Sequence, residues 1–246
     1  MHKETSYYKR FKVLLLSDFL ILSTLIFVGF VSKQDLKINQ HLFQIKSYDS
    51  LHGPGPNYWN KKAVRSKPGK VSLSIRKEKH TLTCSEIKSV NDFETGMYVF
   101  QTSIDFQQLS KDQVLGVFLY ENKDTSNRKE VDVEISKWGK NELQLVYTVH
   151  SKKREVYQEV IKYNPSQSKY THVIAVSDKG VGFDSYEGHL SLNEIDFKNL
   201  NFQYKNTEFA STQFKVHFNN WIYKGESTDQ CFSKLNIHSF EFLPYQ

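Results

Sequence analysis

The chain has 246 residues, 33 of them basic and 27 acidic, which gives a formal net charge of +6. The basic residues are scattered and their small clusters are not interleaved with aromatic residues, so we expect no nucleic-acid partner. A chain of this length can bury a full core without metals or disulfides, and its 18 Phe and 14 Tyr favour an all-β fold. The mild positive charge leaves open an attraction to an anionic polymer or a membrane surface.

Residues 13–31 form a nearly unbroken apolar run in which Asp18 is the only charge. As a helix, this run would reach roughly 28 Å, enough to cross the core of a bilayer. Basic residues precede it, which predicts that the N-terminal stub at 1–12 stays in the cytoplasm and that the rest of the chain is exported. We therefore expect an N-terminal hydrophobic helix followed by an extracytoplasmic domain.

This apolar run has two interpretations, an uncleaved membrane anchor or a cleaved signal peptide. Cleavage requires small residues at positions −1 and −3. Phe27 would stand at −3 for cleavage after Gly29, and Phe30 would stand there for cleavage after Ser32. These bulky residues favour the anchor, and a secreted, cleaved form is the alternative.

Residues 32–52 are polar and mixed in composition, and we interpret them as a linker. The folded domain is expected over 53–246, where a turn-rich entry leads into short alternating runs, as in a large antiparallel β-sandwich. The predicted strands span 71–75, 81–88, 96–104, 113–120, 130–135, 143–149, 156–161, 171–176, 180–186, 214–218 and 235–243.

Acidic and aliphatic residues alternate through the strand predicted at 130–135. Residues i, i+2 and i+4 of a strand share a face, so Glu130, Asp132 and Glu134 should point one way and the aliphatic residues between them should enter the core. Three like charges in a row oppose stability, and an ordinary solvated face would mix Lys, Thr and Ser with the acids. We therefore interpret the row as functional, and a solvated outer face as the alternative.

Glycoside hydrolysis is the chemistry that suits this row. A retaining glycosidase needs two carboxyl groups about 5–5.5 Å apart, one as the nucleophile and one as the acid/base. The Cα atoms of Glu130 and Glu134 should lie about 13 Å apart, so their side chains must lean inward over a concave face. Crowding of like charge raises the pKa of one carboxyl group and keeps that acid protonated near neutral pH.

The acid row resembles the ExDxE signature of glycoside hydrolase family 16, which includes laminarinases, lichenases and agarases. Further segments occur in the order that bacterial members of this family show, at 53–59, 84–89, 95–98, 115–120 and 185–189. The resemblance covers roughly residues 53–244. It implies a concanavalin A-like, jelly-roll β-sandwich.

Carried over residue by residue, the resemblance makes Glu130 the nucleophile, Asp132 its assistant and Glu134 the acid/base. It also implies a set of residues that face the sugar, although each of them has a purely structural interpretation as a core or surface residue. This set consists of Glu86, Tyr120, Trp138, Asn219 and Trp221.

The chain departs from the family after His172. Family members carry a Trp in the strand that follows the matching His, where this chain reads Val-Ile-Ala-Val-Ser, so a sugar-contacting aromatic is expected to be missing. We expect structural or hydrogen-bonding roles for His172 and His189. The resemblance also implies a structural calcium ion, for which the sequence identifies no ligands, and no other cofactor or metal.

The two cysteines, Cys84 and Cys231, lie far apart and outside any zinc-ligand spacing. In an oxidising compartment they could form one disulfide, and the alternative is two separate buried residues.

Three functions are compatible with the sequence. The first is a retaining endo-type hydrolase or transglycosylase, expected as a monomer, acting on an extracellular or cell-wall polysaccharide. The second is a carbohydrate-binding protein without turnover, and the third is a structural surface protein. The intact acid row favours the first. The sequence does not name the sugar or the linkage.

Overall fold

The computed structural model describes residues 35–78, 81–121, 128–152, 154–197, 200–210 and 212–245. The stub at 1–12 and the hydrophobic helix expected over 13–31 lie outside these ranges. Within them, no helix is both long and apolar enough to cross a membrane.

Strands dominate the described part of the chain, and the helical elements are single 3₁₀ turns. In chain order the elements are β1 Leu36–Ile38, β2 His41–Ile45, β3 Tyr58–Trp59, η2 Lys61–Ala63, β4 Val64–Lys67, β5 Lys70–Leu73, β6 Arg76–Glu78, β7 Thr81–Ser89, β8 Gly96–Ile104, η3 Phe106–Gln108, β9 Gln113–Tyr120, β10 Lys129–Ser136, β11 Gln144–Ser151, β12 Arg154–Lys162, β13 Lys169–Ser177, β14 Gly180–Glu187, η4 Leu192–Glu194, η6 Thr207–Phe209, β15 Lys215–Ile222, η7 Tyr223–Gly225 and β16 Leu235–Pro244.

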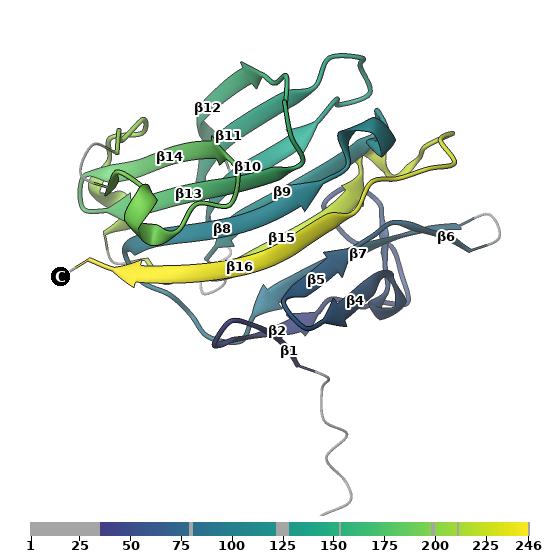
Figure 1. Ribbon diagram of the computed structural model, residues 1–246, viewed down its shortest axis with the longest axis horizontal. Coiled ribbons are helices and arrows are strands. Elements are labelled where there is room, and N and C mark those ends of the chain that lie inside the picture. The colour runs from purple at the N-terminus through teal and green to yellow at the C-terminus, as the bar shows by residue number, and fades with distance from the viewer. Residues whose placement is uncertain are drawn as a thin grey trace, which may run out of the picture. The chain divides into compact units, whose positions relative to one another are not determined.

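Two sheets form the domain (Figure 1). The ten-stranded sheet has the order β1-β2-β7-β15-β9-β10-β11-β12, with β3 and β6 also paired to β7. The six-stranded sheet has the order β14-β13-β8-β16-β5-β4. All pairs of named strands described here are antiparallel except β3 with β7. Strands that are adjacent in space thus come from distant parts of the chain, and the site depends on this arrangement.

The hydrophobic core lies between the two sheets. Phe100 of β8 meets Phe218 of β15 edge-on with ring centroids 5.6 Å apart, and Tyr147 of β11 stacks on Phe183 of β14 at 4.8 Å. Each contact joins one sheet to the other. The expected all-β fold of antiparallel sheets packed face to face is therefore confirmed.

The expected linker at 32–52 is wrong in its central part. β1 pairs with β2, and β2 pairs with β7, so residues 36–45 belong to the ten-stranded sheet. The reason lies in burial, because Leu36, Ile38 and Phe43 enter the core. The compact unit begins at Asp35, well before the predicted boundary at residue 53. Both strands are short, which made their alternation hard to separate from an irregular polar segment.

Candidate active site

The acid row lies on β10, an interior strand of the ten-stranded sheet. The core between the sheets takes in Val131 and Val133, which lie between the acids, and Ile135, which follows Glu134. Because side chains alternate along a strand, Glu130, Asp132 and Glu134 lie on the outer face of this sheet, the face turned away from the six-stranded sheet. The face predicted from the sequence is confirmed.

Burial separates these acids from an ordinary solvated surface. The side chain of Glu130 is 18% exposed and that of Asp132 is 8% exposed. Glu134 is half-buried. Carboxylates on an unused polar face stand in water, so the interpretation as a solvated face fits the structure poorly.

Gly116 of β9 makes room beside Glu134. In the register of the sheet, Gly116 lies opposite Glu134 on one side and opposite Asn219 of β15 on the other. A Cβ atom at position 116 would lie 2.5 Å from Oδ1 of Asn219 and 3.7 Å from Cγ of Glu134. The absence of a side chain there lets the Asn219 amide lean over β9 toward the acid. Asn219 was expected in the site, and the structure brings it next to the predicted acid/base.

The pKa values of two of the three acids are raised. Burial raises the pKa of Asp132 well above its usual range, and the charge of Glu130 adds to this effect while Arg128 opposes it. Burial likewise raises the pKa of Glu134, assisted by the charges of Asp132 and Glu130 and opposed by His150. Asp132 and Glu134 therefore hold a proton more strongly than free carboxyl groups do.

Glu130 makes an ion pair with Arg128, as an ionised carboxylate does. Nη2 of Arg128 donates to Oε2 of Glu130 at 2.6 Å, and the guanidinium carbon lies 5.1 Å from the ring centroid of Tyr120. Tyr120 is also the β9 residue opposite Glu130. The structure thus brings Tyr120 to the predicted nucleophile, and it adds Arg128, whose role the sequence did not suggest.

Glu86 is the centre of a second group on the same sheet, which we call the Glu86 cluster and define as Lys46, Glu86 and His217. Lys46 Nζ donates to Oε2 of Glu86 at 2.8 Å, and His217 Nδ1 lies 3.1 Å from Oε1. Although burial alone would raise the pKa of Glu86, its contacts with His217 and Lys46 outweigh that effect and lower it. Both oxygens of Glu86 are therefore engaged within the protein.

The Glu86 cluster connects to the acid row through an aromatic ring. His217 of β15 stacks on Phe118 of β9 with ring centroids 4.7 Å apart, and Phe118 lies opposite Asp132 in the sheet. Glu86 itself is on β7, three strands away from β10, or about 14 Å at the usual strand spacing. Glu86 therefore lies apart from the acid row, although both are on the same sheet.

An aromatic group lies past the Glu134 end of the row. Trp138 is half-buried and packs edge-on against Trp221, with centroids 6.2 Å apart, and against Tyr223 at 5.4 Å. Trp221 is only 7% exposed, yet no partner accepts a hydrogen bond from its Nε1 among the described residues. Asn219 Oδ1 also lacks a partner there. Two buried polar atoms beside the row are thus left for a water molecule or a ligand.

Sequence reasoning missed Arg128, His150, His217 and Gly116. His150 of β11 lies opposite Glu130, and its Nε2 is 3.3 Å from Oδ2 of Asp132. Each of these residues except Arg128 lies on a strand other than β10, so only the pairing register places it near the row. Arg128 lies on the same face as the row, two residues before Glu130, and the period of two could have found it.

The strand after His172 corrects one expectation. This strand is β13, and it belongs to the six-stranded sheet. Ile174 enters the core between the sheets, and Val173 packs in a separate cluster. No residue here faces the acid row, so the missing Trp does not remove an aromatic from that face. His172 bonds through Nδ1 to Ser185 Oγ at 2.7 Å, and burial lowers its pKa to about 4.

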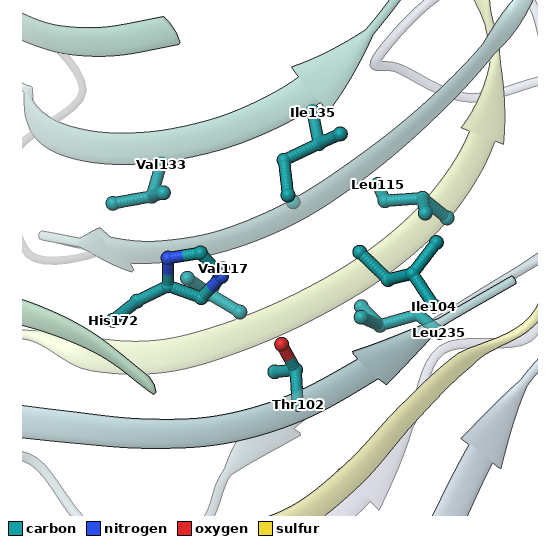
Figure 2. Close-up of a pocket in the computed structure, with 9 residues that line it drawn as sticks. Thr102, Ile104, Leu115, Val117, Val133, Ile135, His172 and Leu235 are labelled. Carbon is teal, nitrogen blue, oxygen red and sulfur yellow. The ribbon is translucent and has the colours of Figure 1, made fainter. Parts of the chain in front are cut away.

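A small cavity lies between the two sheets, on the opposite side of the ten-stranded sheet from the acids. Figure 2 shows the Thr102 hydroxyl and the His172 ring among aliphatic side chains of both sheets. Thr102 Oγ1 has no hydrogen-bond partner among the described residues. The cavity is of a size to hold about one water molecule, and it is too small and too remote to be the substrate site.

The disulfide between Cys84 and Cys231 is not formed. Cys84 is buried, where its Sγ lies 3.3 Å from Oδ1 of Asn57, and Cys231 is exposed. Both are free thiols, so only the first matches the alternative of two separate buried residues. The closing of a long loop could not be decided from sequence separation. His189 donates through Nε2 to the carbonyl of Thr102 at 2.9 Å, in keeping with its expected hydrogen-bonding role.

The resemblance implies a calcium ion, for which the described residues show no cluster of three His, Cys, Asp or Glu side chains that could hold a metal ion. We assign no residue to such an ion.

Comparisons with known proteins agree on the fold. No family model matches the sequence, and no curated protein matches it. Solved structures do match. The β-glucanase of Bacillus licheniformis has a TM-score of 0.65 at 14% identity, covering 85% of this chain and 95% of that one. A laminarinase from Flavobacterium has a TM-score of 0.65 at 13% identity, covering 82% and 92%.

A third match has a different character. It is a pseudo β-1,3-glucanase of Mycobacterium tuberculosis, with a TM-score of 0.61 at 11% identity, covering 83% of this chain and 91% of that one. The three structures define the class of fold as that of the β-glucanases and laminarinases. At these identities they show the fold alone, since one fold hosts several functions.

Proposed function

We propose that the protein is a retaining glycoside hydrolase, or a transglycosylase, that acts on an extracellular or cell-wall polysaccharide. The observation that carries the proposal is that Glu130 and Glu134, in the same row, have different electrostatic surroundings. Glu130 is ion-paired to Arg128, whereas the pKa of Glu134 is raised by burial and by its acidic neighbours. A retaining enzyme needs this pair, one carboxylate and one carboxylic acid.

The first step is the attack of Glu130 on the anomeric carbon of the sugar. Glu134 gives its proton to the leaving glycosidic oxygen as that bond breaks, and a glycosyl ester forms on Glu130. Asp132 lies between the two acids, and its raised pKa lets it share a proton with the nucleophile.

In the second step, Glu134 takes the proton from the attacking molecule. If water attacks, the ester is hydrolysed, and if a sugar hydroxyl attacks, a new glycosidic bond forms. The fold neighbours include a β-glucanase and a laminarinase, which supports a β-glucan as the first substrate to test.

The test is the purified full chain against laminarin, lichenan, agarose and carrageenan, with product release measured. We expect Glu130→Gln and Glu134→Gln each to lose activity by roughly 10³-fold or more, because each removes a group that reacts. Glu142→Gln is the matched control, since Glu142 lies outside the row in an exposed pair with Lys162. Full activity in either row variant would show that the roles are wrong.

The second candidate is a carbohydrate-binding protein without turnover. The match to a pseudo β-1,3-glucanase favours it, since that protein shares the fold. Sugar binding in the parent chain, without product on any of the four polysaccharides, would support this candidate.

A further inference from the structure

The segment from η2 to β6 carries an unusual concentration of positive charge. Among residues 61–78 only Glu78 is acidic, and seven residues are basic. Five of the basic side chains are exposed and two are half-buried. We call this set of residues the basic face, and its members are Lys61, Lys62, Arg65, Lys67, Lys70, Arg76 and Lys77.

The charges of the basic face are not neutralised by the protein. None of its seven side chains takes part in an ion pair with another described residue. Arg76 donates to the carbonyl of Lys62 at 2.9 Å, and Lys77 donates to Oε1 of Gln230 at 3.0 Å. These bonds to neutral oxygens hold the segment together and leave its charge in place. A basic surface of this kind attracts an anionic partner.

The position of the basic face in the domain points to the kind of partner. β4 is the outermost strand of the six-stranded sheet, and it pairs with β5, which pairs with β16. β1, where the described chain begins, contacts β16 as well. Figure 1 shows β1, β2, β4 and β5 gathered below β16, on one side of the domain. The part of the basic face on β4 and β5 therefore shares a side with the start of the domain.

The sequence before β1 contains the apolar run at 13–31. Only residues 32–35 separate that run from Leu36, and so short a segment reaches at most about 18 Å even when extended. This is less than the width of a domain of about 200 residues. If the run is held in a bilayer, the side of the domain that carries β1 and this part of the basic face must stay near the lipid headgroups.

We propose that the basic face docks the domain on a membrane that contains anionic phospholipids. The exposed Lys and Arg side chains contact lipid phosphates, and the short segment at 32–35 keeps them within reach. β10 is separated from β2 by three strands, β7, β15 and β9. The docked domain therefore keeps the acid row away from the lipid and open to a polymer outside the membrane.

The exposed thiol of Cys231 gives a direct test on the full chain. Cys231 follows Gln230, which bonds to Lys77 of the basic face, so a dye on this thiol reports the distance from that face to a membrane. Cys84 is buried and burial raises its pKa to about 12, so it stays unlabelled. The measurement is energy transfer from the dye to an acceptor lipid in phosphatidylcholine vesicles with and without phosphatidylglycerol.

We expect energy transfer to increase with phosphatidylglycerol and to fall in high salt, which screens charge. Arg65→Glu combined with Lys67→Glu should lower the ratio of docked to undocked domain at least about tenfold, since each basic residue near an anionic surface contributes roughly fivefold. Lys140→Glu combined with Lys179→Glu is the control with the same charge change at exposed positions elsewhere.

Two results would overturn the proposal. One is energy transfer that does not depend on the phosphatidylglycerol content of the vesicles, or that is the same in the parent and in the Arg65 and Lys67 double variant. The other is binding of a soluble polyanion, such as heparin or DNA, that depends on these two residues while anionic vesicles have no effect. Thermal unfolding of both double variants should match that of the parent, because all four positions are exposed.

Discussion

Two groups of buried acids lie on the same ten-stranded sheet and behave in opposite ways. In the acid row the pKa of Glu134 is raised, because burial and like charges are only weakly opposed. In the Glu86 cluster the pKa of Glu86 is lowered, because His217 and Lys46 bind both of its oxygens. An acid with acidic neighbours thus holds its proton more strongly, and an acid with basic neighbours stays an ionised carboxylate. The acid row is therefore suited to proton transfer, and the Glu86 cluster is suited to supporting the structure of the sheet.

Breaking the Glu86 cluster should have the largest effect on stability. We expect Glu86→Gln to lower the free energy of unfolding by about 3 kcal/mol, because removing one partner leaves the other charge poorly compensated. Lys46 is only 16% exposed, so water can compensate it only in part. Urea unfolding at neutral pH measures the change.

The matched comparison is Glu142→Gln. Glu142 pairs with Lys162 at the surface, where such pairs contribute less than about 1 kcal/mol. Because the pKa of Glu86 is lowered, its contribution to stability is present above its ordinary value of 4.5 and is lost as the pH falls through the lowered pKa. Equal effects of the two substitutions at neutral pH would contradict the supporting role of Glu86.

Filling the gap beside Glu134 should have a smaller effect on stability. Gly116→Ala places a Cβ atom 2.5 Å from Asn219 Oδ1, and we expect it to cost about 1–3 kcal/mol of unfolding free energy. It should also lower kcat/KM, because Asn219 must move away from the acid. Gly53→Ala is the control, since a Cβ atom there meets nothing within 4 Å. A Gly116→Ala enzyme with unchanged stability and kcat/KM would show that this gap has no role.

Removing the charge of Glu134 should stabilise the fold, and this is the smallest of the expected effects on stability. The folded pKa is raised above the ordinary 4.5, so stability is complete below that pH and declines as the pH rises through the raised pKa. Glu134→Gln should therefore raise the unfolding free energy at pH 8, by an amount on the order of 1 kcal/mol. Near pH 4 the variant and the parent should agree. A variant that is less stable than the parent at pH 8 would contradict the unfavourable charge assigned to this row.

The sequence predicted those features that depend on local alternation. The strands at 96–104 and 113–120 have the predicted bounds, and the face of the acid row follows from its period of two. Short strands were missed. The runs at 36–38 and 41–45 are too brief to show a clear period, and their place in the sheet depends on pairing with a strand some 40 residues later.

The rest of the site could not be predicted, because it depends on register. His150, Gly116 and His217 reach the row from three other strands, and a shift by one residue would turn each of them to the opposite face. Because the sequence does not show which strands are neighbours in space, the residues after His172 were wrongly expected to contact the sugar. A strand can carry the right motif and belong to the other sheet.

The acid row has hydrogen-bonded neighbours along both of its edges. β10 pairs with β9 from Glu130 to Ser136 and with β11 from Lys129 to Ser136. Such a strand cannot bend or slide alone, because any local movement would break the ladder on two sides. The backbone of the row is therefore fixed, and only the side chains on the sheet and the loops at its ends are free to change without breaking these ladders. If the proposed hydrolase activity is correct, its two acids are held at a fixed spacing by this double pairing, and the side chains around them set the choice of sugar.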